Sequence, residues 1–254
     1  MYCKTMSIEA NRPSRSFGQA ADLYDAARPT YPAEALAWLA GDAPKDVVDI
    51  GAGTGLLTRG LIAAGHRVTA VEPDPQMLAK LTAATTGLVA GLEGTAEALP
   101  LPDASADVLT AGQAFHWFDR PKALPELRRV LRPGGVLAPI WNLRDADTPW
   151  VTAVWASIDA SQGERDAVAA TDPGYFGDLF AEPEHRVFRH ERAIDRAGVL
   201  RLVHSRSYYL TADDALRRRI DRDVTDVLDH HPDLAGKETF TLPYNTHAFR
   251  VRPA

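Results

Sequence analysis

The segment that most constrains the fold is an apolar run that ends in a glycine-rich turn and continues directly into a helical pattern. Residues 47–55 read VVDIGAGTG, so a short stretch typical of a buried strand is followed by three alternating glycines. Residues 56–64 then place apolar side chains at helical spacing, and residues 68–71 form a second apolar run. This order of strand, tight turn, helix and strand predicts a parallel sheet with helices covering it.

The same alternation continues as far as residue 141. Helical patterns are expected at residues 75–84 and 121–131, and strands at residues 87–92, 108–111 and 136–141. The sequence Pro133-Gly134-Gly135 is expected to end the second of these helices before the last strand begins. The predicted fold class is therefore α/β, a doubly wound, Rossmann-like and mostly parallel sheet.

Beyond residue 141 the alternation lapses until about residue 183, and such a long segment between sheet elements is typical of a substrate lid. Another strand is expected at residues 186–190, with helical patterns around residues 200–203 and 216–227. Residues 239–252 predict two strand arms kinked at Pro243. We therefore expect one domain, residues 1–254. Its parts are an N-terminal helical cap (1–45), a core (46–142), a lid insertion (143–183), and C-terminal helices and strands that complete the sheet (184–254).

Composition and charge exclude several classes of protein. The 254 residues are 45% hydrophobic and 24% charged, which is enough apolar material for a full core. A formal net charge of -6 disfavours nucleic acid as a partner, because the molecule as a whole repels polyanions. A single cysteine, no apolar run of bilayer length and an N-terminus without an apolar stretch predict a cytoplasmic protein that does not enter a membrane. The oligomeric state is left open.

The glycine-rich turn and an acidic residue that follows it predict a nucleotide-type site. Glycines let the backbone approach a ligand closely, and the helix after them presents free N–H groups. Glu72 ends the second strand, where a carboxylate can accept hydrogen bonds from the hydroxyls of a ribose. Leu56 stands where a dinucleotide-binding motif has its third glycine, which disfavours NAD. The plain alternative is a turn that only joins strand to helix.

Four ordered motifs give this chain a family resemblance. They are VVDIGAGTG at residues 47–55, VTAVEPD at 68–74, GTAEALPLPDASADVLTAGQAFHWF at 94–118 and LRRVLRPGGVL at 127–137. In this order they resemble the class I S-adenosylmethionine-dependent methyltransferases, in particular the small-molecule branch that includes trans-aconitate methyltransferase. The resemblance implies a seven-stranded sheet with an antiparallel last strand. It also implies S-adenosylmethionine as cofactor, bound by residues 46–142 and covered by the cap.

The resemblance also implies a set of cofactor-binding residues that come from separate motifs. Those expected around the methionine part of the cofactor are Tyr24, Arg28, Asp49, Gly51, Ala52, Gly53 and Gln113. Those expected at the ribose and adenine are Glu72, Pro73, Asp74, Ala96 and Glu97. Three of the charged residues also have plain alternatives. Asp49 could be a strand-end or capping residue, Glu97 could stand at a helix start, and Arg28 could be a surface residue before a proline.

The chemistry that the resemblance implies is methyl transfer by positioning. A methyl group on a sulfonium is already activated, so the enzyme has to align the acceptor with it and exclude water. A base is needed only for a neutral hydroxyl or an acidic carbon, and His116 is the candidate, with packing onto the sheet as its alternative role. The candidate substrate residues are Tyr31, Trp117, Trp141 and Arg144, and Arg206 and Arg218 are further candidates for holding a carboxylate.

The predicted function is therefore methyl transfer from S-adenosylmethionine to an oxygen, carbon or nitrogen of a small molecule, such as a carboxylate or a phenolic or polyketide-like metabolite. Two alternatives stay open. One is a protein that binds this cofactor without transferring its methyl group, or that catalyses another reaction; the less favoured one is an NAD-type oxidoreductase. No metal site is expected, because the neighbouring His230 and His231 point apart at a helix end.

Overall fold

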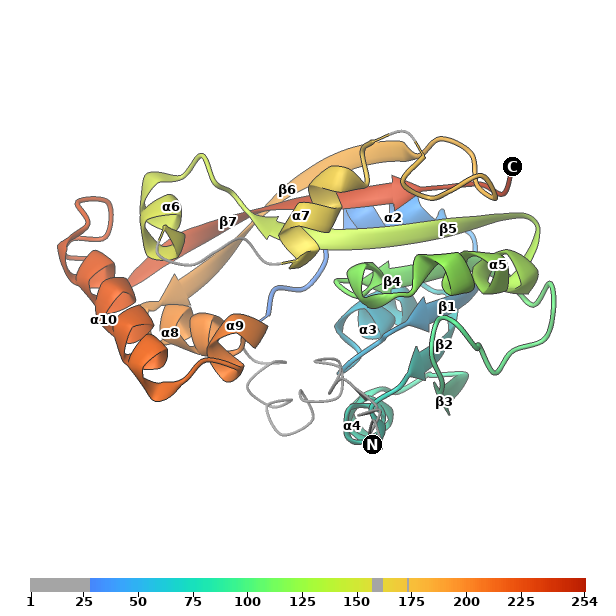
Figure 1. Ribbon diagram of the computed structural model, residues 1–254, viewed down its shortest axis with the longest axis horizontal. Coiled ribbons are helices and arrows are strands. Elements are labelled where there is room, and N and C mark those ends of the chain that lie inside the picture. The colour runs from blue at the N-terminus through green and yellow to red at the C-terminus, as the bar shows by residue number, and fades with distance from the viewer. Residues whose placement is uncertain (1–27, 157–161, 173) are drawn as a thin grey trace, which may run out of the picture.

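The computed structural model describes residues 28–156, 162–172 and 174–254 (Figure 1). Of the predicted cap, residues 1–45, the described part contains helix α2 (Ala33–Ala40). Tyr24, which is predicted to close over the cofactor, lies outside the described residues. The first strand of the sheet begins at Asp46, where the predicted core begins.

The strands form one mixed sheet of seven within the described residues. They are β1 (Asp46–Ile50), β2 (Arg67–Glu72), β3 (Ala90–Glu93), β4 (Ala106–Gly112), β5 (Leu131–Arg144), β6 (Glu184–Asp195) and β7 (Thr239–Arg250). Their order across the sheet is β3-β2-β1-β4-β5-β7-β6. Strands β1 to β5 pair in parallel, and β7 is antiparallel to both of its neighbours. The predicted mostly parallel, doubly wound sheet with an antiparallel last strand is therefore confirmed.

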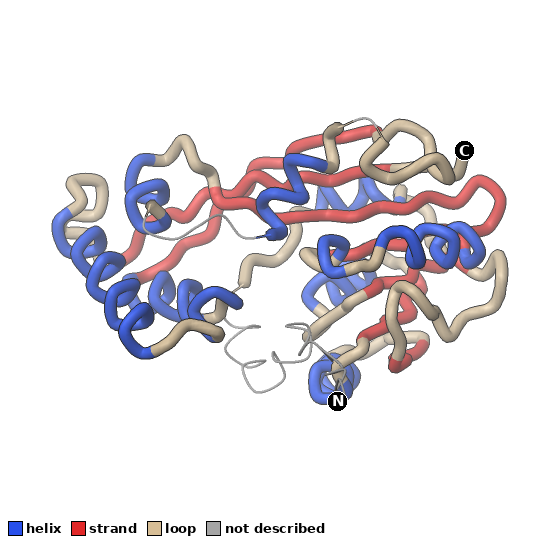
Figure 2. Tube along the Cα trace, in the orientation of Figure 1, coloured by secondary structure: helices blue, strands red, loops and turns tan. Residues whose placement is uncertain are grey.

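Helices cover both faces of this sheet (Figures 1 and 2). Besides α2 they are α3 (Leu56–Ala63), α4 (Pro75–Ala84), the short 3-10 helix η3 (Phe115–Trp117), α5 (Arg120–Val130), α6 (Pro149–Trp155), α7 (Gln162–Ala169), α8 (Arg196–His204), α9 (Ser207–Leu210) and α10 (Asp214–His230). Successive residues of a strand point to opposite faces, so Val47 packs with α2 and α3 while Val48 packs with η3 and α5. Both faces are apolar because both are covered.

Strands β6 and β7 extend beyond the rest of the sheet and carry a helical lobe, by which we mean α6, α8, α9, α10 and the ribbon ends that they cover (Figure 1). The β5 strand ends at Arg144, opposite Tyr244, whereas β7 begins at Thr239 and pairs with β6 throughout. The lobe has its own apolar cluster. Ile220, Val224 and Leu228 of α10 recur at four-residue spacing and are buried, which is why this helix packs onto the ribbon.

The predicted kink at Pro243 is wrong, because β7 is a single strand whose pairing with β6 continues through Pro243 opposite Glu191. The carbonyl of Pro243 faces the β5 side, where it accepts a hydrogen bond from the N–H of Asp145 at 3.0 Å. The proline nitrogen lies on the same side, beyond the end of β5. Because proline has no N–H and its nitrogen faces a position where β5 has already ended, the sheet loses no hydrogen bond there, and the strand continues.

The fifth strand is longer than predicted at both ends. It begins at Leu131 and includes Pro133-Gly134-Gly135, and it continues past Trp141 to Arg144. The pairing with β4 passes from Leu131 directly to Val136, so the residues between them bulge out of the ladder. The extension beyond Trp141 exists because β7 supplies a partner there, and that pairing is not visible in the local pattern.

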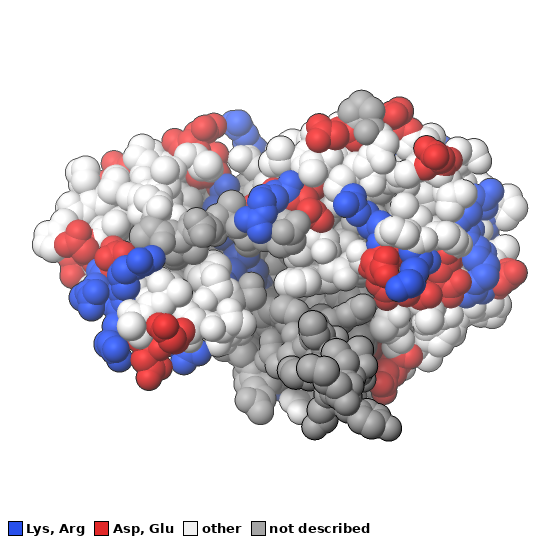
Figure 3. Space-filling view, in the orientation of Figure 1, with Lys and Arg blue, Asp and Glu red and all other residues white. Residues whose placement is uncertain are grey.

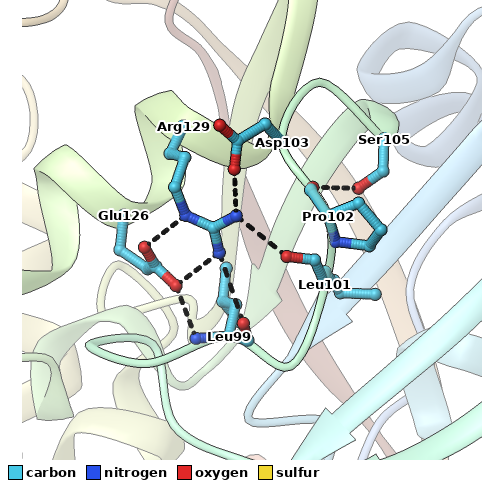
Figure 4. A network of polar contacts seen from close by, with 7 residues as sticks. All are labelled: Leu99, Leu101, Pro102, Asp103, Ser105, Glu126 and Arg129. Atoms are coloured by element: carbon cyan, nitrogen blue, oxygen red, sulfur yellow. Dashed lines mark hydrogen bonds and ion pairs between the residues drawn. The ribbon is translucent and has the colours of Figure 1, made fainter.

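A polar network around Arg129 fixes the long loop between β3 and β4 (Figure 4). The guanidinium donates to both carboxylate oxygens of Glu126 at 2.7 Å, to Asp103 at 2.6 Å and to the carbonyl of Leu101 at 2.9 Å. Glu126 in turn accepts the N–H of Leu99 at 2.8 Å. The hydrogen bonds from Arg129 hold the pKa of Glu126 below its usual range. The network ties α5 to the segment that leads into β4.

We expect Arg129→Met to lower the free energy of unfolding by about 2 kcal/mol, because Glu126 loses its bidentate partner and the carbonyl of Leu101 loses its hydrogen-bond donor at a partly exposed position. The neighbouring Arg128 is exposed and makes no contact in this network. Arg128→Met is therefore the matched control, with an expected change below about 0.5 kcal/mol. Urea unfolding of the two variants measures the difference. Equal midpoints would show that the network does not stabilise the fold.

Candidate functional site

The glycine-rich turn between β1 and α3 has the close backbone approach that the sequence predicts. Gly51, Gly53 and Gly55 have φ angles of 65°, 57° and 87°, a region that favours glycine. The N–H groups of Gly51 and Ala52 both donate to the carbonyl of Val71, at 2.8 and 3.2 Å. The turn is thus bonded to the end of β2 and is held in a fixed shape.

Glu72 joins this turn to the end of β2 through its carboxylate. One oxygen accepts the N–H of Gly53 at 2.8 Å, and the other accepts the N–H of Asp74 at 3.0 Å. The side chain is buried, and burial raises its pKa. A carboxylate has about four acceptor positions, so two remain for the hydroxyls of a ribose. Glu72 therefore fits the predicted ribose contact and also stabilises the turn.

Asp49 is a fully buried residue, and only one of its two carboxylate oxygens has a hydrogen-bond partner among the described residues. Its Oδ2 accepts the hydroxyl of Thr58 at 2.6 Å. Its Oδ1 is buried and has no hydrogen-bond partner among the residues that the structure describes. Burial raises the pKa of Asp49 to about 7. A buried acceptor without a donor is unfavourable unless a ligand supplies one, and an amino group is such a donor.

The residues predicted at the adenine have visible structural roles. Asp74 is the N-cap of α4 and accepts the N–H groups of Gln76 and Met77. Ala96 is buried in the core, and Pro73 lies partly buried beside Glu72. Glu97 accepts the N–H of Asp119, the residue before α5, at 2.7 Å. The helix-start role considered for Glu97 thus has an observed contact, whereas its contact with adenine stays a prediction.

Gln113 follows β4 and is held in an uncommon conformation. Its φ is 57°, although it is not a glycine, and such strain is typical of functional positions. The side-chain amide donates to the carbonyl of Asn142 at 2.7 Å. Asn142 donates to the carbonyl of Thr30 at 3.1 Å and accepts the hydroxyl of Thr246 at 2.6 Å. Asn142 was not predicted from the sequence. The pattern that could have identified it is a polar residue near the end of a buried strand.

A pocket lies between the carboxyl ends of β4 and β5 and the helical lobe; we call it the edge pocket. It encloses about 280 Å³ of space that is open to solvent. Its polar lining residues are Arg28, Tyr31, Gln113, Asn142 and Arg206. The structure therefore brings together four residues predicted from the sequence, namely Arg28, Tyr31, Gln113 and Arg206. Ligands of open α/β sheets bind at this edge of the sheet.

The remaining candidates lie elsewhere. Trp141 has no exposed surface and packs edge-on against Phe115 and Phe249 in the core, whereas Trp117 is 38% exposed. Arg144 is buried and pairs with Glu164. None of these three predicted substrate residues lines the edge pocket itself. Arg218 is exposed on α10. Among the described residues no group of three His, Cys, Asp or Glu could hold a metal ion.

Known proteins with similar sequences place this chain in a family. A family model described as "Methyltransferase domain" matches residues 48–138. A protein of Mycobacterium tuberculosis named as an uncharacterized methyltransferase is 40% identical over 97% of this chain and 99% of its own. The chain belongs to the class I S-adenosylmethionine-dependent methyltransferases. It is therefore an enzyme that uses S-adenosylmethionine.

Two further comparisons extend this assignment. The malonyl-[acyl-carrier protein] O-methyltransferase of Serratia marcescens is 31% identical over 78% of each chain. The solved structure of a provisionally assigned type II methyltransferase from Anaeromyxobacter dehalogenans superposes with a TM-score of 0.64 and 26% identity, over 89% of this chain and 97% of that one. The finer resemblance to trans-aconitate methyltransferase is not confirmed by these comparisons. No helix in the described part of this methyltransferase is long and apolar enough to cross a membrane.

We expect cofactor binding to this methyltransferase to tighten as the pH rises towards about 7. Below that pH the buried carboxyl of Asp49 is protonated in the free protein, whereas we expect the charged form to attract the amino group of the cofactor. The affinity for S-adenosylhomocysteine should rise by up to about tenfold per pH unit and level off above pH 7. Asp49→Asn cannot ionise and should bind weakly without this rise. Calorimetric titrations from about pH 5.5 to 8.5 compare the two, and equally flat profiles would exclude Asp49.

Proposed function

We propose that this enzyme methylates a small-molecule acceptor that binds in the edge pocket. The observation that carries the proposal is the position of Gln113, which lines the pocket and stands next to the glycine-rich turn at the adjoining strand end. The net charge of -6 disfavours nucleic acid. The acceptor atom is proposed to be oxygen, carbon or nitrogen.

The residues of this chain act by binding and orientation. When bound, S-adenosylmethionine supplies an electrophilic methyl group. Asp49 and the glycine-rich turn would hold its methionine part, Glu72 its ribose, and the segment from Pro73 to Glu97 its adenine. Gln113 is fixed by its hydrogen bond to Asn142, so the part of the pocket wall that Gln113 forms is held in place. Rigid alignment of two reactants supplies much of the rate enhancement of a displacement reaction.

An oxygen acceptor has support from a relative. The Serratia marcescens protein is named for O-methylation of malonyl-[acyl-carrier protein] and is 31% identical to this chain. A carboxylate is already ionised at neutral pH, so its methylation needs no base.

His116 is proposed as the base for any acceptor that carries a proton. Burial lowers its pKa to about 4, so the imidazole is neutral at pH 7 and free to accept a proton, although it is a weaker base than an exposed histidine. Its Nδ1 is buried and has no partner among the described residues. We expect His116→Asn to reduce kcat by about 100-fold with an unchanged KM for the cofactor. The exposed His230→Asn is the control, and an unchanged kcat would limit His116 to packing.

Product analysis tests the proposed function. The full-length protein is incubated with S-adenosylmethionine labelled in its methyl group and with a panel of carboxylic acids, phenols and amines. A labelled small-molecule product, absent when Glu72→Ala replaces the wild type, is the expected result. Binding of S-adenosylhomocysteine without any labelled product would favour a cofactor-binding protein of another kind. No binding at millimolar ligand would contradict the whole site.

A further inference from the structure

The helical lobe brings a buried arginine into the edge pocket. Arg206 follows α8, is 8% exposed and lines the pocket together with Gln113 and Asn142. Its Nε is buried and has no acceptor among the residues that the structure describes. Arginine is rarely buried unless a carboxylate or another acceptor accompanies it. The described residues therefore do not account for the buried position of Arg206.

A second buried arginine lies near it. Arg144 ends β5, pairs with Glu164 and stacks over Trp155 with its guanidinium carbon 4.2 Å from the ring centre. Its Nη1 is also buried without an acceptor within the described part of the chain. Burial, and after it the positive charge of Arg206, lowers the pKa of Arg144 to about 10. The charge of Arg206 thus disfavours the charged form of Arg144, whereas the carboxylate of Glu164 favours it.

Two tyrosine hydroxyls add donors to the same place. Tyr244 stands directly opposite Arg144 in the pairing of β5 and β7, so both side chains lie on one face of the sheet. The hydroxyls of Tyr244 and Tyr208 are buried and have no partner among the described residues. Burial raises the pKa of Tyr244, and the charges of Arg206 and Arg144 oppose that rise. Donors therefore converge here, and the part of the chain that the structure describes supplies no acceptor for the two hydroxyls.

We propose that Arg206 and Arg144, with the hydroxyls of Tyr244 and Tyr208, form a subsite for an oxyanion on the methyl acceptor, a carboxylate or a phosphate ester. This inference rests on the proposed function, because it names the class of molecule that enters the edge pocket. Guanidinium and hydroxyl groups donate, and an oxyanion accepts several such hydrogen bonds at once. Figure 3 shows basic atoms in the hollow between the helical lobe and the sheet.

The carboxylate of the cofactor itself is the competing occupant. Arg28 is the residue predicted to pair with it, and Arg28 lines the same pocket. The two assignments differ in what the loss of Arg206 does. If Arg206 holds the acceptor, its removal leaves cofactor affinity unchanged. If it holds the cofactor, that affinity falls and binding of a separate anion does not depend on Arg206.

Anion titrations decide between these outcomes. Malonate and inorganic phosphate are titrated at constant ionic strength into full-length protein saturated with S-adenosylhomocysteine. We expect saturable binding of at least one of them, weakened at least tenfold by Arg206→Met and unchanged by Arg218→Met, which removes an exposed arginine of α10. Tighter malonate binding would indicate a carboxylate acceptor, and tighter phosphate binding a phosphate ester. Affinity for S-adenosylhomocysteine should stay within twofold in both variants.

Three results would overturn the proposal: equal anion binding in all variants, no saturable binding by the wild type, or loss of cofactor affinity alone in Arg206→Met. Urea unfolding monitors the fold, and Arg206→Met should not lower the midpoint, because no described acceptor is lost with the guanidinium. If that variant does unfold, Tyr244→Phe removes only a hydroxyl and repeats the test. If S-adenosylhomocysteine fails to bind the wild type, the proposed function fails, and the same titrations without it still test the subsite.

Discussion

Glu72→Ala is expected to weaken binding of S-adenosylhomocysteine by about 100-fold, the largest effect on affinity that the site predicts. Two charge-assisted hydrogen bonds from ribose hydroxyls would be lost, together with the brace between Glu72 and Gly53, for about 3 kcal/mol in total. Glu93 stands opposite Glu72 on β3 but is exposed, so Glu93→Ala is the matched control. Calorimetry measures both affinities.

Stability has to be measured beside affinity, because Glu72 also accepts the N–H of Asp74. If the variant unfolds at the same urea concentration as the wild type, the loss of affinity belongs to the ribose contact. If affinity is unchanged while the midpoint falls, Glu72 only stabilises the turn and is not a cofactor ligand. Either result separates the two roles that the geometry combines.

Gly51→Ala is expected to lower the free energy of unfolding by about 3 kcal/mol. The alanine would be held in a left-handed backbone conformation that is unfavourable for it, and its methyl group would have no space. The φ of Gly51 is 65°, and an added Cβ would lie 2.7 Å from the Cβ of Ala114. Gly65 has a φ of 92° but nothing within 4 Å of the same position. Gly65→Ala therefore carries only the backbone strain, about 1 kcal/mol.

Urea unfolding of the two alanine variants measures the difference. The added methyl group at Gly51 would collide with the Cβ of Ala114. Because that Cβ is fixed by the backbone and cannot rotate away, only a shift of the turn itself can relieve the contact. Cofactor affinity of Gly51→Ala should fall as well, since this turn is the predicted contact for the methionine part. Equal destabilisation by both variants would mean that the turn has more room than the geometry indicates.

The cofactor-binding half of the molecule is largely determined by local patterns. The run VVDIGAGTG places a buried strand, a tight turn and a helix in succession, and short-range sterics leave few other arrangements. The seven strands and the antiparallel β7 were implied by the resemblance and are confirmed. The free oxygen of Asp49 and the bond from Gly53 to Glu72 were not predictable, because they depend on distances between separate segments.

The candidate substrate residues show where local patterns fail. Trp141 and Arg144 lie three residues apart on β5 and looked equally suited to a pocket, yet Trp141 is a core residue with no exposed surface. Which face of β5 is covered, and by what, depends on η3, α7 and β7, which come from distant parts of the chain. The alternation of side chains along a strand predicts which residues share a face, but it does not predict what each face contacts.

By itself the sequence determined the doubly wound core, the glycine-rich turn with Glu72 and Asp49, and membership of a methyltransferase family, because these depend on neighbours in the chain. The sequence offered Arg144 and Arg206 only as separate candidates, and the tertiary structure decided which residues accompany them in the proposed anion subsite. Arg144, Arg206 and Tyr244 meet because β7 returns antiparallel to β5 and the β6–β7 ribbon carries the helical lobe to the sheet edge. Whether a buried donor finds an acceptor depends on contacts between segments that are distant in the sequence, and no short-range pattern predicts those contacts.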